Sequence, residues 1–382
     1  MKRIIVFNIG TNIGGIETSL IQFLRFLAHE DCSVDLVLWK KPGELFEKIP
    51  PEINILPSPA PGGWRSLHAA KGRVKENVAQ FCRILQYKAD ARRGCAWAHF
   101  PAIEDEYDVA ISYCQNGYSP YYVIDKVRAK KHILFFHHGS YDANLPQYKR
   151  DKCYYRQYDQ IITVSEANKR MLSGHFPELE EKISVVHNLI DVDRIRKMAD
   201  ESLAEDEAKG LCKIVTVGRL STEKGQLFAL EVARELEISK FPFQWLFVGD
   251  GPEKERCRNK VAELGLLDCC RFIGARENPY PYIKHADIYV QSSYVEADPV
   301  TLQEGLALFK PIIASDIPAV RETLQNGKLG VLCGFSPKEF AKVIQKVYMS
   351  TTAQKALIDN IKQTGSRNTI SEYLLRKNLN LL

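Results

Sequence analysis

Two glutamates eight positions apart, Glu296 and Glu304, and two cations, Arg219 and Lys224, are the residues of this sequence best suited to chemistry. Arginine binds phosphate oxygens in a bidentate manner, and lysine adds a mobile point charge. Carboxylates accept hydrogen bonds from the hydroxyl groups of a ribose or a sugar. Together the four side chains indicate a pocket for a diphosphate and its sugars, and therefore an enzyme that uses a nucleotide-activated sugar.

A predicted helix near these glutamates offers further contacts. The helix is expected to begin near Thr301, so the amides of Thr301 and Leu302 would point toward negative charge. Glu304 lies one turn into the helix and could reach the same ligand. An acid in a first turn is also common as a complement to the helix dipole or in a capping box.

Two features of the first half could contribute to the same chemistry. Gly14 and Gly15 follow the first predicted strand, where glycine lets the backbone approach a ligand, although a tight turn explains them equally well. The turn matches neither the dinucleotide-binding fingerprint nor a Walker P-loop. His137 and His138 end another strand, so one should point toward a ligand while the other packs or faces solvent.

Length and composition are typical of a soluble globular protein with two domains. The 382 residues include 45% hydrophobic and 26% charged residues. No apolar run approaches the roughly 20 residues that span a bilayer, and the N-terminal apolar run is too short for a signal peptide. Ten cysteines without C-x-x-C spacing indicate free thiols in a reducing cytoplasm.

The net charge of +5 is concentrated in one segment. Residues 62–100 carry eight Lys and Arg against two Asp and Glu, a surplus of +6, with aromatic residues between the charges. Such a segment can lie on an anionic membrane surface. It can equally be a solvated helix face that packs on its own domain, and both interpretations stay open.

Short β-branched runs alternate with helical stretches in both halves of the chain, which predicts parallel sheets covered on both faces. In the first half the expected strands are 3–7, 33–39, 54–56, 108–113, 132–137, 160–164 and 183–187. In the second half they are 213–217, 243–248, 271–273, 288–291, 311–314 and 330–332. The clearest helices are expected at 16–28, 226–236, 253–264, 302–308 and 337–348. The predicted fold class is α/β, with two Rossmann-like doubly wound domains facing across a cleft.

The alternation of predicted strands and helices is interrupted by a charged stretch without strand character. We interpret residues 196–209 as a linker. The first domain would then end at residue 195 and the second would cover 210–365. In open parallel sheets, ligands bind beyond the carboxyl ends of the strands. The loops that carry Arg219, Lys224 and Glu296 are therefore placed where a ligand is expected.

The second half resembles the nucleotide-sugar half of the glycosyltransferase family 4 (group 1) enzymes, which have the GT-B fold. The matching motifs are Val217-Gly218-Arg219-Leu220 with Glu223-Lys224-Gly225, Val248-Gly249-Asp250-Gly251-Pro252, Phe272-Ile273-Gly274, Ala286-Asp287-Ile288, the E-x7-E pair Glu296 and Glu304, and Lys310-Pro311 with Ser315-Asp316. The first half matches more thinly, through Gly14-Gly15-x-Glu17, His138-Gly139, Val164-Ser165-Glu166 and His187-Asn188 with Asp191.

The resemblance implies a retaining transferase that needs neither a metal nor a cofactor. Catalytic roles would fall to Arg219 and Lys224 on the donor diphosphate, Glu296 on the transferred sugar and His138 near the reacting carbon. Donor-binding roles would fall to Gly14, Gly15, Arg276 near the base, Asp298, Thr301, Leu302, and Glu304 on the ribose. The first domain, 1–195, would bind the acceptor and be completed by residues 366–382.

The sequence departs from the family pattern in two places. The loop after Glu296 reads Ala297-Asp298-Pro299, where the family often has glycine with an aromatic residue. Pro299 has no amide to donate, and Asp298 adds a carboxylate near the sugar. Phe309 stands where a small residue commonly precedes Lys-Pro. The identity of the sugar is therefore the property that transfers least from the family.

The sequence thus predicts a cytoplasmic retaining glycosyltransferase, with a UDP-sugar as the first candidate donor. The expected acceptor is a glycan, lipid-linked and part of a surface polysaccharide, and the expected location is the inner face of the plasma membrane. One alternative is a nucleotide-sugar epimerase of the same fold, and another is an inactive sugar-nucleotide-binding subunit. Nucleic-acid binding is not expected, because the net charge is modest and no recognition motif is present.

Overall fold

The computed structural model describes residues 1–60, 94–203, 210–365 and 367–382. The chain forms two compact units, the first made of Met1–Leu189 with Thr369–Leu382 and the second of Ile190–Asn368. Most of the basic segment 62–100 lies outside the described residues, and the membrane-surface prediction that rests on it lies outside them too. Within the described part of the chain, no helix combines the length and apolar character needed to cross a membrane.

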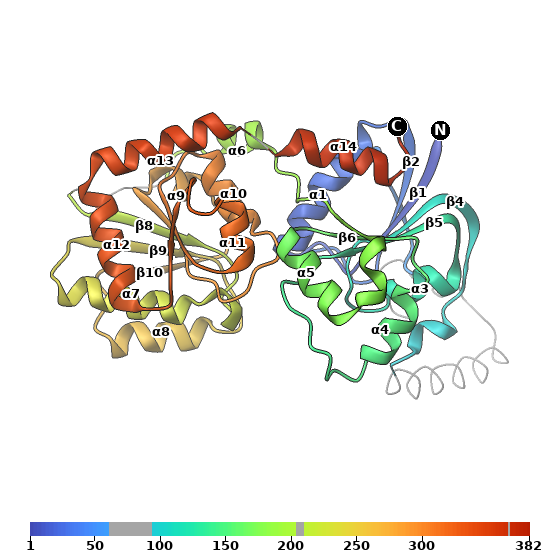
Figure 1. The fold of residues 1–382 in the computed structure, drawn as a ribbon, viewed down its shortest axis with the longest axis horizontal. Helices are drawn as coiled ribbons and strands as arrows, with labels where there is room; N and C mark the ends of the chain where they lie inside the picture. Colours follow the sequence, from blue (N-terminus) through green and yellow to red (C-terminus); the bar gives the residue numbers. More distant parts are fainter. Residues whose placement is uncertain (61–93, 204–209, 366) are drawn as a thin grey trace. The chain divides into compact units, whose positions relative to one another are not determined.

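The first unit is built on a parallel sheet with the order β3-β2-β1-β4-β5-β6-β7 (Figure 1). Its strands are β1 (Lys2–Asn8), β2 (Cys32–Leu38), β3 (Asn54–Leu56), β4 (Ile103–Ser112), β5 (Val127–Phe136), β6 (Gln160–Thr163) and β7 (Ile183–Val185). Its helices are α1 (Gly15–Ala28), α3 (Ser119–Lys126), α4 (Tyr148–Tyr155), α5 (Glu166–His175) and α14 (Asn368–Asn378), with short turns η1 (Phe46–Lys48), η2 (Ala96–His99) and η3 (Pro177–Lys182).

Helices cover both faces of this sheet, because side chains alternate along each buried strand. In β1, Ile4 and Val6 pack into the cluster that α1 and α14 close, whereas Ile5 and Phe7 pack toward α3, α4 and α5. Helix α1 contributes its apolar face to the first cluster, and α14 contributes Leu375 among others. The C-terminal segment is thus part of the first unit.

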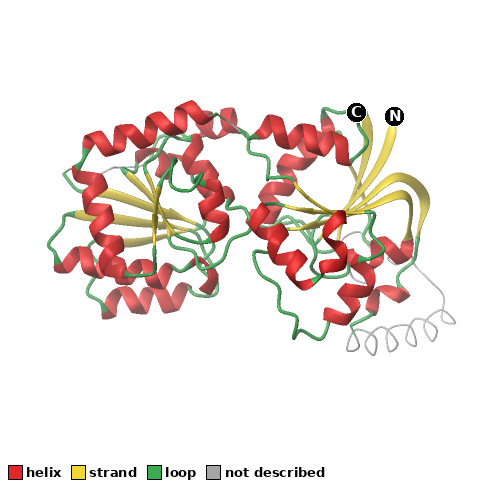
Figure 2. Cartoon of the chain, viewed as in Figure 1, coloured by secondary structure: helices red, strands yellow, loops and turns green. Residues whose placement is uncertain are grey.

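The second unit repeats the arrangement with the order β10-β9-β8-β11-β12-β13, again entirely parallel (Figure 2). Its strands are β8 (Cys212–Val217), β9 (Phe243–Val248), β10 (Cys270–Gly274), β11 (Ile288–Gln291), β12 (Ile312–Ser315) and β13 (Val331–Cys333). On one face lie α7 (Gln226–Ile238), α8 (Lys254–Glu263) and α12 (Pro337–Met349). On the other lie α9 (Tyr280–His285), α10 (Val300–Ala307), α11 (Pro318–Thr323) and α13 (Thr351–Thr364). The two doubly wound parallel-sheet domains confirm the predicted fold class.

The start of the second unit differs from the expected domain boundary. Helix α6 (Val192–Met198) packs with α9 and α10 of the second unit, although residues up to 195 were assigned to the first domain. Arg196 Nε donates to the carbonyl oxygen of Ala307 at 3.1 Å, and Asn278 Nδ2 donates to that of Met198 at 2.9 Å. These long-range contacts fix α6 to the second unit, and the charged sequence of the helix gave no sign of them.

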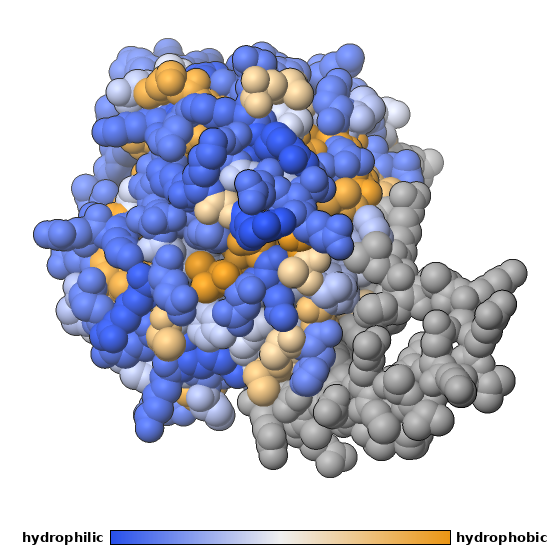
Figure 3. Space-filling model, turned by 90° about the vertical axis from the view of Figure 1, so that its right-hand side faces the viewer, coloured by the Kyte–Doolittle hydropathy of each residue, from blue (hydrophilic) through white to orange (hydrophobic). Residues whose placement is uncertain are grey.

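Hydrophobic residues are mainly inside both units. On the face drawn in Figure 3, hydrophilic residues predominate and hydrophobic ones form small separate areas. The cores of both units lie on the two sides of their sheets, where β-branched and aromatic side chains are almost fully buried. The loops at the carboxyl edges of the strands are therefore held by rigid elements on both sides.

Candidate functional site

Two loops at the carboxyl edge of the second sheet, one after β8 and one after β11, are bound tightly to each other. The amide of Tyr294 donates to the carbonyl oxygen of Glu223 at 2.8 Å, and Ser292 Oγ donates to that of Lys224 at 3.1 Å. Gly225 has φ +65°, and a Cβ atom there would lie 2.1 Å from the carbonyl oxygen of Ser292. Only glycine fits both the backbone conformation and this approach, so the loops keep a fixed relative position.

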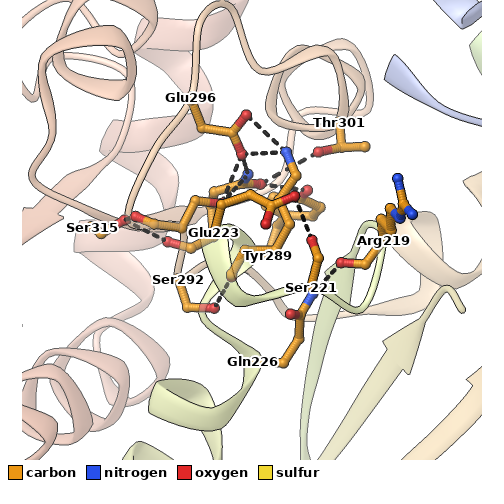
Figure 4. A network of polar contacts seen from close by, with 12 residues as sticks. Arg219, Ser221, Glu223, Gln226, Tyr289, Ser292, Glu296, Thr301 and Ser315 are labelled. Carbon is orange, nitrogen blue, oxygen red and sulfur yellow. Dashed lines mark hydrogen bonds and ion pairs between the residues drawn. The ribbon is translucent and has the colours of Figure 1, made fainter. Parts of the chain in front are cut away.

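The contact brings Lys224 and Glu296 together as an ion pair (Figure 4). Lys224 Nζ lies 2.7 Å from Glu296 Oε1 and 2.8 Å from Oε2. Gln291 Nε2 and Ser293 Oγ each donate to Oε1 at 2.7 Å. The side chain of Glu296 is 7% exposed and that of Lys224 26%. Lys224 therefore neutralises the charge of Glu296. The ammonium group of Lys224 has three protons, and two of them suffice for the two contacts with Glu296, so the third can be donated to an anion.

Arg219 and Arg276 follow β8 and β10 at the same edge of the sheet, and both are exposed. The carbonyl oxygen of Arg219 accepts from Gln226 Nε2 at 2.8 Å, while its guanidinium group extends away from the network around Glu296 (Figure 4). Arg276 Nε donates to Tyr282 OH at 3.3 Å. Both side chains are placed to meet a ligand that arrives from solvent.

Glu304 lies in α10 and is 5% exposed. Tyr280 OH donates to its Oε1 atom at 3.2 Å. Burial raises the pKa of Glu304 to about 7, and the hydrogen bond from Tyr280 opposes this shift only in part. A buried carboxylate of this kind is well suited to accept hydrogen bonds from neutral hydroxyl groups, because these would replace the lost water.

The N-terminus of α10 differs from expectation in one respect. The helix begins at Val300, and the amide of Leu302 donates to the carbonyl oxygen of Pro299 at 3.1 Å. This tightened first turn uses the amide that we expected Leu302 to offer to a phosphate, while Thr301 directs its hydroxyl to Gln291 Oε1 at 3.4 Å. Helix starts often tighten in this way, because the first amides have no intrahelical acceptor.

Asp298, which precedes α10, is 6% exposed. Gln303 Nε2 donates to its Oδ1 atom at 3.0 Å, so the carboxylate lies against the first turn of the helix. A negative charge is favourable there because it complements the helix dipole. Its contribution to sugar binding stays a prediction.

The remaining predicted residues belong to the first unit. Gly14 is the N-cap of α1, and nothing lies within 4 Å of a Cβ atom built on Gly15, so the backbone there is open to a ligand. His137 is buried with its ring 4.9 Å from that of Tyr113, and burial, with a smaller effect of His138, lowers its pKa to about 3. His138 is exposed, with Nε2 3.0 Å from the amide nitrogen of Asn116. The two histidines thus differ in exposure as expected, although both follow the end of β5 at Phe136.

Sequence reasoning missed the residues that orient the two glutamates, namely Tyr289, Gln291 and Ser293 around Glu296, and Tyr280 beside Glu304. A signal for the first group is present in the sequence. Tyr289 and Gln291 are two positions apart in a predicted buried strand, so they share a face, and polar groups at such positions need partners.

Two exposed arginines, the Lys224–Glu296 ion pair and the buried carboxyl group of Glu304 thus share one edge of the second sheet. The arrangement can bind a diphosphate at Arg219 and Lys224 and hydroxyl groups at Glu296 and Glu304. Charge that develops on a departing phosphate would meet groups already in position, which is commonly the largest contribution to catalysis.

Comparison with known proteins places the chain in a family. The family profile of glycosyl transferases group 1 matches residues 199–364, and that of glycosyltransferase family 4 matches residues 13–194. Together the matches take in both units. The chain therefore belongs to the group 1 glycosyltransferases, and its two parallel-sheet units are those of the GT-B fold.

Individual relatives are distant. The chain is 30% identical over 170 residues to an uncharacterized glycosyltransferase of Methanocaldococcus jannaschii. These 170 residues cover 43% of this chain and 41% of the relative. It is 24% identical over 219 residues to the amylovoran biosynthesis glycosyltransferase AmsK of Erwinia amylovora, 54% of this chain and 52% of the relative. The chain thus spans about half the length of the curated relatives it matches.

Solved structures share the fold along the whole chain. HepE of Anabaena, solved in complex with UDP and glucose, superposes with a TM-score of 0.72 at 15% identity and 100% coverage of both chains. WaaG, a glycosyltransferase involved in lipopolysaccharide biosynthesis, gives a TM-score of 0.63 at 12% identity and 98% coverage of both chains. At these identities the likeness concerns the fold.

Proposed function

We propose that the protein is a retaining, metal-independent glycosyltransferase that moves a sugar from a nucleoside-diphosphate donor to a glycan acceptor. The observation that carries the proposal is the Lys224–Glu296 pair, which sits between two loops at the carboxyl edge of the second sheet. Lys224 and Arg219 hold the donor diphosphate, Glu296 the transferred sugar and Glu304 the ribose. Arg276 lies beside the base, and the first turn of α10 faces the phosphates.

The chemistry follows from where charge develops. Breaking the glycosidic bond leaves positive charge on the sugar ring and negative charge on the diphosphate. Lys224, held by Glu296, stabilises the departing charge from a fixed position, and the exposed Arg219 adds a second cation. With the acceptor on the leaving-group face, a phosphate oxygen takes the proton of the acceptor hydroxyl, and the configuration at the anomeric carbon is retained.

The donor and acceptor classes are supported by the relatives. HepE was solved with UDP and glucose, which makes a UDP-sugar the first donor to test. One relative is named for amylovoran biosynthesis and another for lipopolysaccharide core biosynthesis, so we assign this chain to the synthesis of a surface polysaccharide on a lipid-linked acceptor. Within the first unit, His138 contacts the transferred sugar, Gly14 contributes to donor binding, and Gly15 admits the diphosphate and the acceptor.

A donor screen tests the proposal. Nucleoside diphosphates and their sugars are added in a thermal-shift experiment, since a ligand of the native state raises the melting temperature. We expect one base to stabilise the protein both as the diphosphate and as the sugar nucleotide. Incubation with the sugar nucleotide alone should then give slow hydrolysis. A new epimer would instead identify an epimerase, and binding without turnover on any glycan acceptor would identify an inactive subunit.

The proposed location is the inner face of the plasma membrane. The surplus of +6 in residues 62–100 supports it, because each basic residue near an anionic surface adds about 1 kcal/mol of attraction. Co-sedimentation with anionic liposomes at low salt should deplete the protein from the supernatant. Failure to bind, together with activity on water-soluble acceptors only, would refute the membrane assignment and leave the transferase proposal standing.

A further inference from the structure

The two carboxylate oxygens of Glu296 are not equivalent. Oε1 accepts from three donors, Lys224 Nζ, Gln291 Nε2 and Ser293 Oγ, each at 2.7 Å. Among the residues that the structure describes, Oε2 accepts from Lys224 alone, at 2.8 Å. A carboxylate oxygen has about two lone pairs, so the capacity of Oε1 is already used. A sugar hydroxyl that binds Glu296 must therefore donate to Oε2.

Gln291 distinguishes the two carboxylate oxygens of Glu296, because its amide group is held in one orientation and donates to Oε1. Its Nε2 atom faces Glu296, while Oε1 accepts from Tyr289 OH at 2.9 Å and from Thr301 Oγ1 at 3.4 Å. A flipped amide would turn its oxygen toward the carboxylate of Glu296 and lose the donors on the other side. Gln291 is 3% exposed, so water cannot easily replace these partners.

Tyr289 in turn is fixed by packing. Its ring is fully buried, and a Cβ atom built on Gly305 of α10 would lie 3.3 Å from Tyr289 Cγ. The phenol therefore fills the space that Gly305 leaves and cannot turn away from Gln291. The hydroxyl of Tyr289 touches Gln291, and its contribution to Glu296 can act only through that amide.

We propose that Gln291, oriented by Tyr289, is a positioning residue that turns Oε2 of Glu296 toward the transferred sugar. The inference rests on the proposed function, since it assigns a part in the transfer step. Without the amide, Glu296 keeps Lys224 and Ser293 as partners but loses the buried donor that sets the orientation of its carboxylate. Small displacements of this kind are costly because the reacting groups must be aligned.

The first test compares phenylalanine substitutions that each remove one hydroxyl. Tyr289→Phe should lower kcat by about 3- to 10-fold, because one buried neutral hydrogen bond is lost. UDP, which lacks the transferred sugar, should bind Tyr289→Phe as tightly as it binds the wild type. Tyr280→Phe, which removes the donor to Glu304, should instead change UDP affinity. Tyr348→Phe, in α12 against Phe241, serves as the neutral control.

The second test substitutes Gln291 itself. Gln291→Leu should lower kcat by about 10- to 100-fold, since a hydrogen bond to a charged group is lost, and again leave UDP binding unchanged. Gln291→Glu puts a second carboxyl group beside Glu296. When protonated this group can donate to Oε1, and when ionised it repels Glu296, so the kcat of Gln291→Glu relative to wild type should recover as pH falls.

The outcomes separate the inference from the function it rests on. Wild-type kcat in Tyr289→Phe and Gln291→Leu would overturn the positioning role while leaving a working transferase. A parallel loss of UDP binding and kcat would overturn it too, because a general collapse of the site explains that result. A wild-type protein that turns over none of the nucleoside-diphosphate sugars in the donor screen would overturn the proposed function, and the inference with it.

Discussion

The buried carboxyl group of Glu304 should make the stability of the second unit depend on pH. Burial raises its pKa from an ordinary value of 4.5 to about 7. The folded state therefore binds this proton more tightly than the unfolded state, so its stabilising effect is full below pH 4.5 and is lost as pH rises through 7. At 1.36 kcal/mol per pKa unit, the loss amounts to about 3 kcal/mol. Glu304→Gln has no such proton and should not show this loss.

The measurement is urea denaturation of wild type and Glu304→Gln at pH 5 and pH 8. The two units need separate signals, because a chain of two units does not unfold in one step. Fluorine NMR of 5-fluorotryptophan provides them, since Trp245 is fully buried in the second unit. Because the unfolded carboxyl group is already mostly ionised at pH 5, we expect the stability of Glu304→Gln relative to wild type to rise by about 2.5 kcal/mol between pH 5 and pH 8. An identical pH dependence in both proteins would refute the argument.

Three further predictions concern the site. Lys224→Gln should lower kcat by about 100-fold or more in initial-rate assays, because a fixed cation at the leaving group is lost; a wild-type rate would contradict its role. Nucleotide-sugar affinity, measured by calorimetry, should strengthen as pH rises through about 7, since ribose hydroxyls favour the ionised form of Glu304; the opposite slope would contradict this assignment. Gly225→Ala should destabilise the protein by about 2 kcal/mol or more in urea denaturation, whereas Gly15→Ala, where a Cβ atom meets nothing within 4 Å, should have little effect. Equal effects of the two glycine substitutions would refute the packing argument.

The strands were predictable because both faces of each sheet are covered. Mainly apolar runs such as Phe243–Val248 and Ile288–Gln291 can be identified as strands from the sequence alone. The observed strands have the same limits. β4 and β5 begin earlier than expected, at Ile103 and Val127. Their first halves are partly exposed and carry charged residues, so they lack the apolar signal although their backbones pair.

The contents of the site were only partly predictable. Glu296 and Lys224 could be named from their types and loop positions, and the structure brings these two together. Their distance of 2.7 Å depends on how the loops after β8 and β11 close around Gly225, which is a tertiary contact. The same holds for the raised pKa of Glu304, which comes from burial by residues distant in sequence.

The amide network around Gln291 shows a different limit. Alternation in β11 places Tyr289 and Gln291 on one face, but a strand pattern does not say that this face meets a carboxylate. Likewise, the start of α10 was expected within a residue or two, yet the use of the Leu302 amide inside the first turn could not be foreseen. Hydrogen-bond partners of single groups follow from geometry that spacing alone leaves open.

The central claim is that the carboxyl edge of the second sheet binds a nucleotide-activated sugar. A crystal structure of the protein saturated with UDP-glucose, or with the sugar nucleotide that the thermal-shift screen selects, tests it most directly. We predict diphosphate density within hydrogen-bonding distance of Arg219 and Lys224, the ribose at Glu304 and the hexose at Oε2 of Glu296. Density for the ligand at another place on the chain, with these four side chains untouched, would contradict the account.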